Sequence, residues 1–203
     1  MKRIACIVEG EGERLAFPWL CNRILFNHLR ASEWSVNQEA FRYPRGSLVD
    51  GKSPSPRRPC VRREVDRVVR LAQRVGKADA VIALCDADDD CPAVWGPDAS
   101  AVITAILPGG AVMACREYES WLLWSRPEGE RTRAGVTSSP EQLRDAKGAM
   151  RHFVQNYRPT AHQLPETQGL DIAHVRARSD SFDKLVRTLA TICGVQPPPR
   201  PAL

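Results

Sequence analysis

Two short, wholly apolar runs that each end in acidic residues constrain the fold of this chain most. Ile4–Val8 leads into an acidic, glycine-rich turn, and Ala80–Cys85 leads into a run of aspartates. Apolar runs of this length are typical of central parallel strands that helices cover on both faces. The sequence therefore predicts buried strands over Lys2–Val8 and Asp79–Cys85, with carboxylates at their carboxyl ends.

Helical patterns alternate with these strands. Apolar residues recur at helical spacing from Leu15 to Leu29, and a stripe of valines between arginines predicts an amphipathic helix over Val61–Val75 that ends near Gly76. Alternation of strands and helices predicts an α/β fold of the Rossmann-like kind, with a mostly parallel central sheet flanked by helices. The remaining expected strands are Val36–Tyr43 and Ala111–Cys115, and the remaining expected helices are Ala99–Leu107, Glu117–Trp124, Glu141–Tyr157 and Phe182–Cys193.

The length of 203 residues suits one domain, which we expect over 1–195 with a helical C-terminal part from about residue 140. A Pro-rich tail, expected to fray, follows at 196–203. No apolar run approaches the roughly 20 residues that cross a bilayer, and the N-terminus becomes acidic too early for a signal peptide. The seven cysteines include no Cys-x-x-Cys pair, which favours reduced thiols over zinc. We expect a cytoplasmic protein without a membrane segment.

Three of the expected strands end in carboxylates: Glu9, then Asp86 with Asp88, then Glu117 with Glu119. The carboxyl ends of parallel strands share one edge of a sheet, where clustered carboxylates repel each other unless a cation offsets them. Hard oxygen ligands suit magnesium or manganese. Asp86 and Asp88 are alternate residues of an expected extended segment and so point the same way. Glu117 and Glu119, two apart on an expected helix, cannot share a face.

Other charged residues lie near these carboxylates in the sequence or in the expected fold, and two of them have two interpretations. Glu11 and Glu13 are interpreted as acids at a helix N-terminus, where the helix dipole favours them. Lys147 is either an exposed helical lysine or a cation that offsets charge on a phosphate. Arg116, beside the acidic edge, contacts phosphate or forms an ion pair with Glu9 or Asp86.

The net charge of +5 is unevenly spread, because arginines crowd the region of the proline-rich loop Pro44–Pro59. Such a basic segment attracts a polyanion, although it is often only a solvated loop. The residues expected to contact nucleic acid are Arg57, Arg58, Arg62, Arg63 and Arg116.

Segments Ile4–Glu13 and Leu84–Asp88 together resemble the TOPRIM domain of topoisomerases, primases and overcoming-lysogenization-defect nucleases. The further segments Asp88–Pro92, Arg116–Trp121 and Arg178–Phe182 are similar to a small bacterial TOPRIM-like family of unknown function. The resemblance spans most of the chain and implies a TOPRIM fold.

The resemblance also implies roles for single residues. Glu9 would act as general acid or base, and Asp86 with Asp88 would coordinate magnesium. Members of the nuclease branch often work with an ATPase partner in defence against phage. The candidate catalytic residues are Glu9, Asp86, Asp88, Glu117 and Lys147, and the candidate metal ligands are Glu9, Asp86, Asp88 and Glu119.

The leading hypothesis is a magnesium- or manganese-dependent endonuclease that cleaves DNA or RNA. Its expected partners are the nucleic acid, an ATPase of the AAA or ABC type, because the chain has no ATP-binding loop of its own, and a second copy of itself in a homodimer. Two alternatives stay open: a non-catalytic nucleic-acid-binding or regulatory subunit, and a metal-dependent phosphohydrolase that acts on nucleotides.

Overall fold

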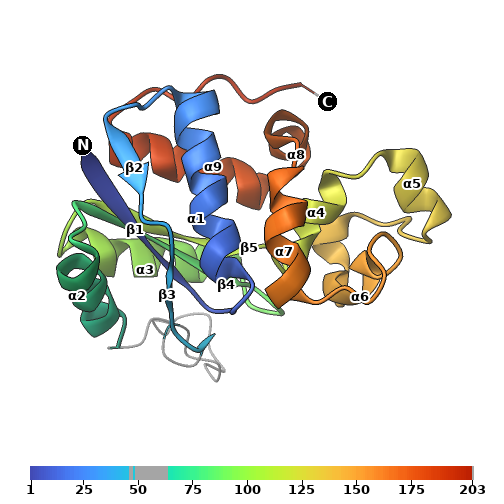
Figure 1. Ribbon diagram of the computed structural model, residues 1–203, viewed down its shortest axis with the longest axis horizontal. Helices are drawn as coiled ribbons and strands as arrows, with labels where there is room; N and C mark the ends of the chain where they lie inside the picture. Colours follow the sequence, from blue (N-terminus) through green and yellow to red (C-terminus); the bar gives the residue numbers. More distant parts are fainter. Residues whose placement is uncertain (46–47, 49–63, 203) are drawn as a thin grey trace.

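The structure is a computed structural model that describes residues 1–45, 48 and 64–202. Its centre is a five-stranded sheet in which every pairing is parallel (Figure 1). The strand order is β2-β1-β4-β5, and β3 also pairs with β1, beyond the end of β2. The strands are β1 (Lys2–Val8), β2 (Trp34–Val36), β3 (Phe41–Arg42), β4 (Ala80–Asp86) and β5 (Gly109–Ala114). The predicted α/β class with a parallel sheet is confirmed.

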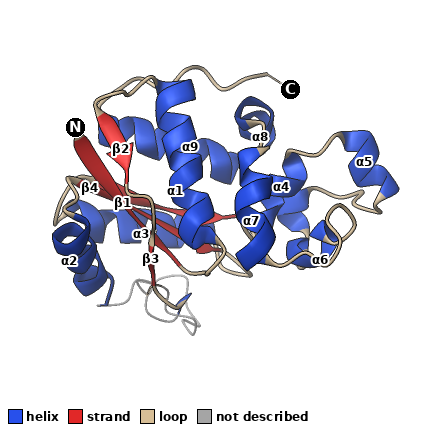
Figure 2. Cartoon of the chain, viewed as in Figure 1, coloured by secondary structure: helices blue, strands red, loops and turns tan. Residues whose placement is uncertain are grey.

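Both faces of the sheet are buried, so alternate residues of β1 belong to different cores. Ile4, Cys6 and Val8 pack into one cluster and Ala5 and Ile7 into the other. The first cluster is covered mainly by α1 (Glu13–Arg23) and α9 (Asp180–Cys193), and the second by α2 (Glu64–Gly76) and α3 (Pro92–Thr104) (Figure 2). This two-sided burial explains why β1 and β4 are apolar without alternation.

The helix after β1 has a proline in its interior. Pro18 lacks the N–H that would bond to the carbonyl of Arg14, four residues earlier. That carbonyl instead accepts a hydrogen bond from the backbone N–H of Ala40, at 2.9 Å. Helix α1 continues into the π-helical turn η1 (Ile24–Leu29) and ends at Arg30, which has a left-handed conformation with φ 52°. Because Pro18 leaves the carbonyl of Arg14 without its helical partner, that carbonyl can bond to Ala40 and so connects α1 to the segment between β2 and β3.

The single strand predicted over Val36–Tyr43 is wrong in detail, because the chain forms two short strands there. Trp34–Val36 pairs with the start of β1 and Phe41–Arg42 with its end. The side chain of Asn37 leaves the sheet and donates to the carbonyl of Gly76, at 3.1 Å. The edge next to β1 is thus interrupted between the two strands.

The C-terminal third holds more, shorter helices than predicted. The helix expected over Glu141–Tyr157 is wrong: a 3-10 turn and a five-residue helix occupy this stretch. Ser179 caps α9, since its hydroxyl accepts from the backbone N–H of Phe182 at 3.0 Å. The further helices are α4 (Glu119–Trp124), α5 (Glu128–Arg133), η3 (Pro140–Gln142), α6 (Ala146–Met150), α7 (Pro159–Gln168) and α8 (Ile172–Arg178).

The tail expected to fray is anchored by one side chain. Arg200 donates to the carbonyls of Arg176 and Ala177 and pairs with Asp180 at 2.6 Å. Within the described ranges, no helix has the length and apolar character needed to cross a bilayer.

Candidate active site

The carboxyl edge of the sheet gathers the acidic side chains, as the strand ends predicted. Glu9 follows β1, Asp86 ends β4, and Glu117 and Glu119 follow β5. Glu13, at the start of α1, joins them, since Asp86, Glu119 and Glu9 all raise its pKa through their charge. We refer to Glu9, Glu13, Asp86, Glu117 and Glu119 as the acidic cluster.

Asp86 lies at the centre of the acidic cluster and is only 4% exposed. Its Oδ1 accepts a hydrogen bond from the backbone N–H of Tyr118 at 2.8 Å, and its Oδ2 lies 3.2 Å from Nζ of Lys147. Burial raises the pKa of Asp86, while the Lys147 ammonium and the Tyr118 N–H oppose the rise. The carboxyl is therefore held in place from two sides.

Lys147 reaches the acidic cluster from α6. Its Nζ lies 3.2 Å from Asp86 Oδ2 and 3.5 Å from Glu117 Oε1, and its backbone N–H donates to Glu117 Oε2 at 2.9 Å. Burial lowers the pKa of Lys147, but the charges of Asp86, Glu119 and Glu117 outweigh it, so the pKa is raised. The ammonium contacts two carboxylates, so Lys147 is not simply an exposed helical lysine.

Glu9 faces a second cation, Arg45, which lies at the end of the segment after β3. Arg45 Nη1 lies 3.6 Å from Glu9 Oε2, and its Nε lies 3.5 Å from Asp88 Oδ2. Arg45 also donates to the backbone carbonyls of Asp86 and Ala87. Burial and the neighbouring Asp86 raise the pKa of Glu9 to about 7, against the opposing effect of Arg45. Near neutral pH, Glu9 can therefore exchange a proton readily.

From the sequence, Glu13 was interpreted only as a helix-capping acid. The structure also places it in the acidic cluster. Its Oε2 accepts from the backbone N–H of Gly10 at 2.8 Å, which is a capping contact, but the residue is only 3% exposed. Burial and the charge of Asp86 raise its pKa to about 8. The available signal was its spacing, because Glu13 shares a helical face with Phe17 and Leu20, which are buried.

Glu119 is fully buried beside side chains that the sequence did not single out. Its Oε1 accepts from the hydroxyl of Tyr157 at 3.1 Å and from Nε2 of Gln163 at 3.4 Å. Burial raises the pKa of Glu119 to about 7, although Lys147 opposes the rise. Tyr157 belongs to the irregular segment after α6, and Gln163 belongs to α7. The apolar pattern did not predict these two elements.

The arrangement of Asp86 and Asp88 differs from the prediction. Asp88 has a left-handed backbone conformation with φ 49°, so the chain is no longer extended there and the two carboxylates do not point the same way. Asp86 is buried against Lys147, whereas the Asp88 side chain is 58% exposed and pairs with Arg45. The predicted common direction of the pair is wrong because the chain turns at Asp88.

The expectations for Arg116, Glu117 and Glu119 also need correction. Arg116 pairs with Asp89 and donates to the carbonyl of Asp88 at 2.7 Å, so its partner is neither Glu9 nor Asp86. Glu117 precedes α4, which begins at Glu119, so the helical spacing that would separate them does not apply. The charges of Glu117 and Glu119 both raise the pKa of Lys147. Arg57, Arg58, Arg62 and Arg63 lie outside the described residues.

The divalent cation implied by the resemblance fits the donor chemistry of the acidic cluster. Glu9 Oε2 and Glu119 Oε2 are buried and accept no hydrogen bond from the described part of the chain, and carboxylate oxygens are the ligands such ions prefer. Among residues 1–45, 48 and 64–202, no three acidic, histidine or cysteine side chains are placed to hold an ion together. Lys147 and Arg45 lie against the carboxylates instead, so an ion would have to take the place of one of these side chains.

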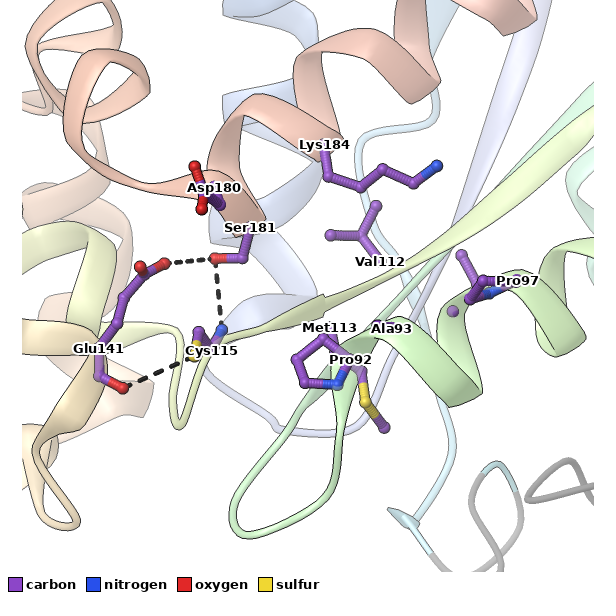
Figure 3. A pocket seen from close by; sticks show the side chains of 12 residues that line it. Pro92, Ala93, Pro97, Val112, Met113, Cys115, Glu141, Asp180, Ser181 and Lys184 are labelled. Carbon is purple, nitrogen blue, oxygen red and sulfur yellow. Dashed lines mark hydrogen bonds between the residues drawn. The ribbon is translucent and has the colours of Figure 1, made fainter. Parts of the chain in front are cut away.

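A cavity of about 310 Å³ lies beside β5, at the outer edge of the sheet. Figure 3 shows Pro92 and Pro97 of α3 on one side and Lys184 of α9 on the other. At the polar end of the cavity, the hydroxyl of Ser181 donates to the carboxylate of Glu141 at 2.8 Å, so these two polar groups already have a partner within the protein. Asp180 and Lys184 add two charged side chains to a lining that is otherwise mainly apolar, and the acidic cluster does not line the cavity.

Comparison of the chain with protein-family models, curated proteins and solved structures found no match.

Proposed function

We propose that this protein is a metal-dependent nuclease of the TOPRIM type that hydrolyses phosphodiester bonds of DNA or RNA. The observation that carries the proposal is the position of Asp86, Glu117 and Glu119 around the Lys147 ammonium, with Glu9 close to Asp86, at the carboxyl edge of a parallel sheet. In open α/β sheets, ligands bind at this edge.

The acidic cluster supplies the groups that phosphodiester hydrolysis needs. Glu9, whose pKa is about 7, accepts a proton from the attacking water as a general base. Lys147 offsets negative charge that develops on the phosphate oxygens. A magnesium or manganese ion that took the place of Lys147 or Arg45 would draw its ligands from Asp86, Asp88 and Glu119. The bound ion would supply Lewis acidity and a more acidic water.

The surroundings of the acidic cluster favour a polynucleotide over a small phosphate ester. Arginines flank the edge on both sides: Arg45 and Arg42 beside β3, and Arg116 and Arg144 beside Asp89. Side chains of Arg42 and Arg144 are 51% and 81% exposed, and their ion pairs with Glu11 and Asp89 are exposed too, so both arginines can exchange these partners for phosphates next to the cleaved bond.

The proposal includes the setting in which such a nuclease would work. Buried free thiols at Cys6, Cys21 and Cys85 suit the reducing cytoplasm. An ATPase partner and a homodimer, both implied by the resemblance or left open by the sequence, are part of the proposal and need their own tests by co-purification and by light scattering.

The test uses the purified full chain with plasmid DNA and with transfer RNA, in magnesium, in manganese and in a chelator. We expect cleavage that requires the ion and falls at least about 100-fold in Glu9→Gln and Asp86→Asn. Glu64→Gln removes one exposed carboxylate from α2 and should cleave as the unaltered protein does. Circular dichroism shows whether each variant is folded.

Three results would contradict the proposal. Equal cleavage by Glu9→Gln would point to a contaminating nuclease. Hydrolysis of mononucleotides without cleavage of either polymer would favour the phosphohydrolase. Binding of nucleic acid without cleavage, both alone and with an ATPase partner supplied, would favour a non-catalytic subunit.

A further inference from the structure

Three arginines from separate segments meet at a second cavity, formed by other residues than the acidic cluster. Arg131 comes from α5, Arg178 ends α8, and Arg200 belongs to the C-terminal segment. The cavity has a volume of about 460 Å³. Its other lining residues are Trp124, Glu128, Thr137, Ser138, Ser139 and Ala177.

Arg131 is buried without a counter-charge. It is only 7% exposed, and its guanidinium carbon lies 4.6 Å from the centre of the Trp124 ring. No carboxylate of the described residues lies within 4.0 Å of it, and its Nε is buried with no hydrogen-bond partner among them. The free energy of burying a guanidinium is unfavourable unless an anion or hydrogen bonds compensate it.

The pKa of Arg131 is lowered by this burial, with Arg178 adding to the effect and Glu128 opposing it. Glu128 is exposed, so water screens its charge. The positive charge at the cavity is therefore in excess.

The two other arginines are placed by contacts that leave their charge available. Arg178 Nη1 lies 3.2 Å from Nδ1 of His174 and 3.4 Å from its carbonyl oxygen, and neither is a carboxylate. Arg200 is fixed by two backbone carbonyls and by Asp180, whose side chain is 90% exposed. Water therefore weakens the ion pair between Arg200 and Asp180, and no other pair of these three arginines with a carboxylate is found among the described residues.

The rest of the lining is rich in hydrogen-bond donors. Thr137, Ser138 and Ser139 contribute hydroxyls, and the buried Nε1–H of Trp124 has no partner in the described part of the chain. Guanidiniums and hydroxyls together match the oxygens of a tetrahedral oxyanion. A volume of about 460 Å³ also leaves room for an organic group attached to it.

We propose that the cavity formed by Arg131, Arg178 and Arg200 binds a phosphate monoester, with its phosphoryl group between the guanidiniums. The guanidinium Nη groups of Arg131 and Arg178 donate to its oxygens. Binding here does not require the acidic cluster or its metal, so the site exists whether or not the chain cleaves nucleic acid.

The experiment titrates the full chain with inorganic phosphate, adenosine monophosphate and adenosine by calorimetry, in a chelator and a phosphate-free buffer. The variants are Arg131→Gln and Arg178→Gln. Arg133→Gln is the matched control, since Arg133 lies on the same helix, is exposed and does not line the cavity. The indole N–H resonance of Trp124, assigned through Trp124→Phe, reports binding at the cavity itself.

We expect inorganic phosphate and adenosine monophosphate to bind, adenosine not to bind, and the Trp124 resonance to shift. Both cavity variants should bind the phosphates about tenfold or more weakly, because each loses charge-assisted hydrogen bonds, and Arg133→Gln should bind unchanged. If Arg131→Gln does not fold, the half-buried Arg178→Gln provides the same test. Equal binding of adenosine, or equal weakening in all three arginine variants, would overturn the proposal.

Discussion

The buried carboxyl of Glu13 allows a sharp test of the electrostatics of the acidic cluster. Its pKa is raised to about 8 by burial first and by the charge of Asp86 second. In the unfolded chain a glutamate titrates near pH 4.5, so the folded protein keeps a proton that the unfolded chain has lost between these values. Below pH 4.5 the titration of Glu13 does not lower the free energy of unfolding. Between pH 4.5 and about 8 it lowers this free energy progressively.

The size of the effect follows from the two pKa values. Each tenfold difference in proton affinity corresponds to about 1.36 kcal/mol, so raising the pKa from 4.5 to about 8 lowers the free energy of unfolding at pH 8 by up to about 4 kcal/mol. Glu13→Gln removes the titrating group while its amide oxygen still accepts the N–H of Gly10. We expect this variant to be more stable than the unaltered protein at pH 8, and nearly equal to it at pH 4.5.

Urea denaturation at pH values from 4.5 to 8, with a chelator present, measures this difference. Glu11→Gln is the control, because Glu11 lies two residues away and its side chain is 48% exposed. The control should follow the pH dependence of the unaltered protein. The same pH dependence in Glu13→Gln would refute the idea that a proton is held at this position, and would place Glu13 outside the acidic cluster energetically.

Two further predictions concern the packing of the acidic cluster. A methyl group at Gly12 would lie 2.1 Å from Gln163 Oε1 and 2.8 Å from Pro159 Cβ. We therefore expect Gly12→Ala to displace α7 and to lower stability by about 1–3 kcal/mol in thermal denaturation, and unchanged stability would contradict this close approach. Tyr157→Phe removes the closer of the two donors to Glu119 Oε1 and should lower stability by about 1–3 kcal/mol in urea, whereas a neutral effect would mean that Gln163 or water satisfies the carboxylate.

The strands and part of the acidic cluster were predictable because their signals are local. An apolar run that ends in an acid identifies a buried strand and places Glu9 and Asp86 at its end. The burial of Glu13 and the partners of Glu119 depend instead on helix α7, whose sequence contains Pro165 and few apolar residues. Its helical state comes from packing on α1, a tertiary effect that a periodicity search does not detect.

The failure over Glu141–Tyr157 has a local cause. Asp145 caps α6, and its side chain accepts from the backbone N–H of Gly148 at 2.7 Å, so a new helix starts where the apolar spacing predicted a continuous one. A Cβ at Gly148 would lie 2.0 Å from Asp145 Oδ2, which shows how tightly this cap closes. Capping residues inside an apolar pattern therefore outweighed its spacing.

That same cap explains how Lys147 comes to the acidic cluster. Asp145 starts α6, and Glu117 accepts the N–H of Lys147 in its first turn. The side chain then reaches Asp86, 61 residues earlier in the sequence. A carboxylate as buried as Asp86 needs a positive partner close by. A bound metal ion would supply the same charge at the same place. In the proposed nuclease, Lys147 and the ion would therefore be alternative partners for Asp86, and ion binding would free the ammonium to act on the phosphate.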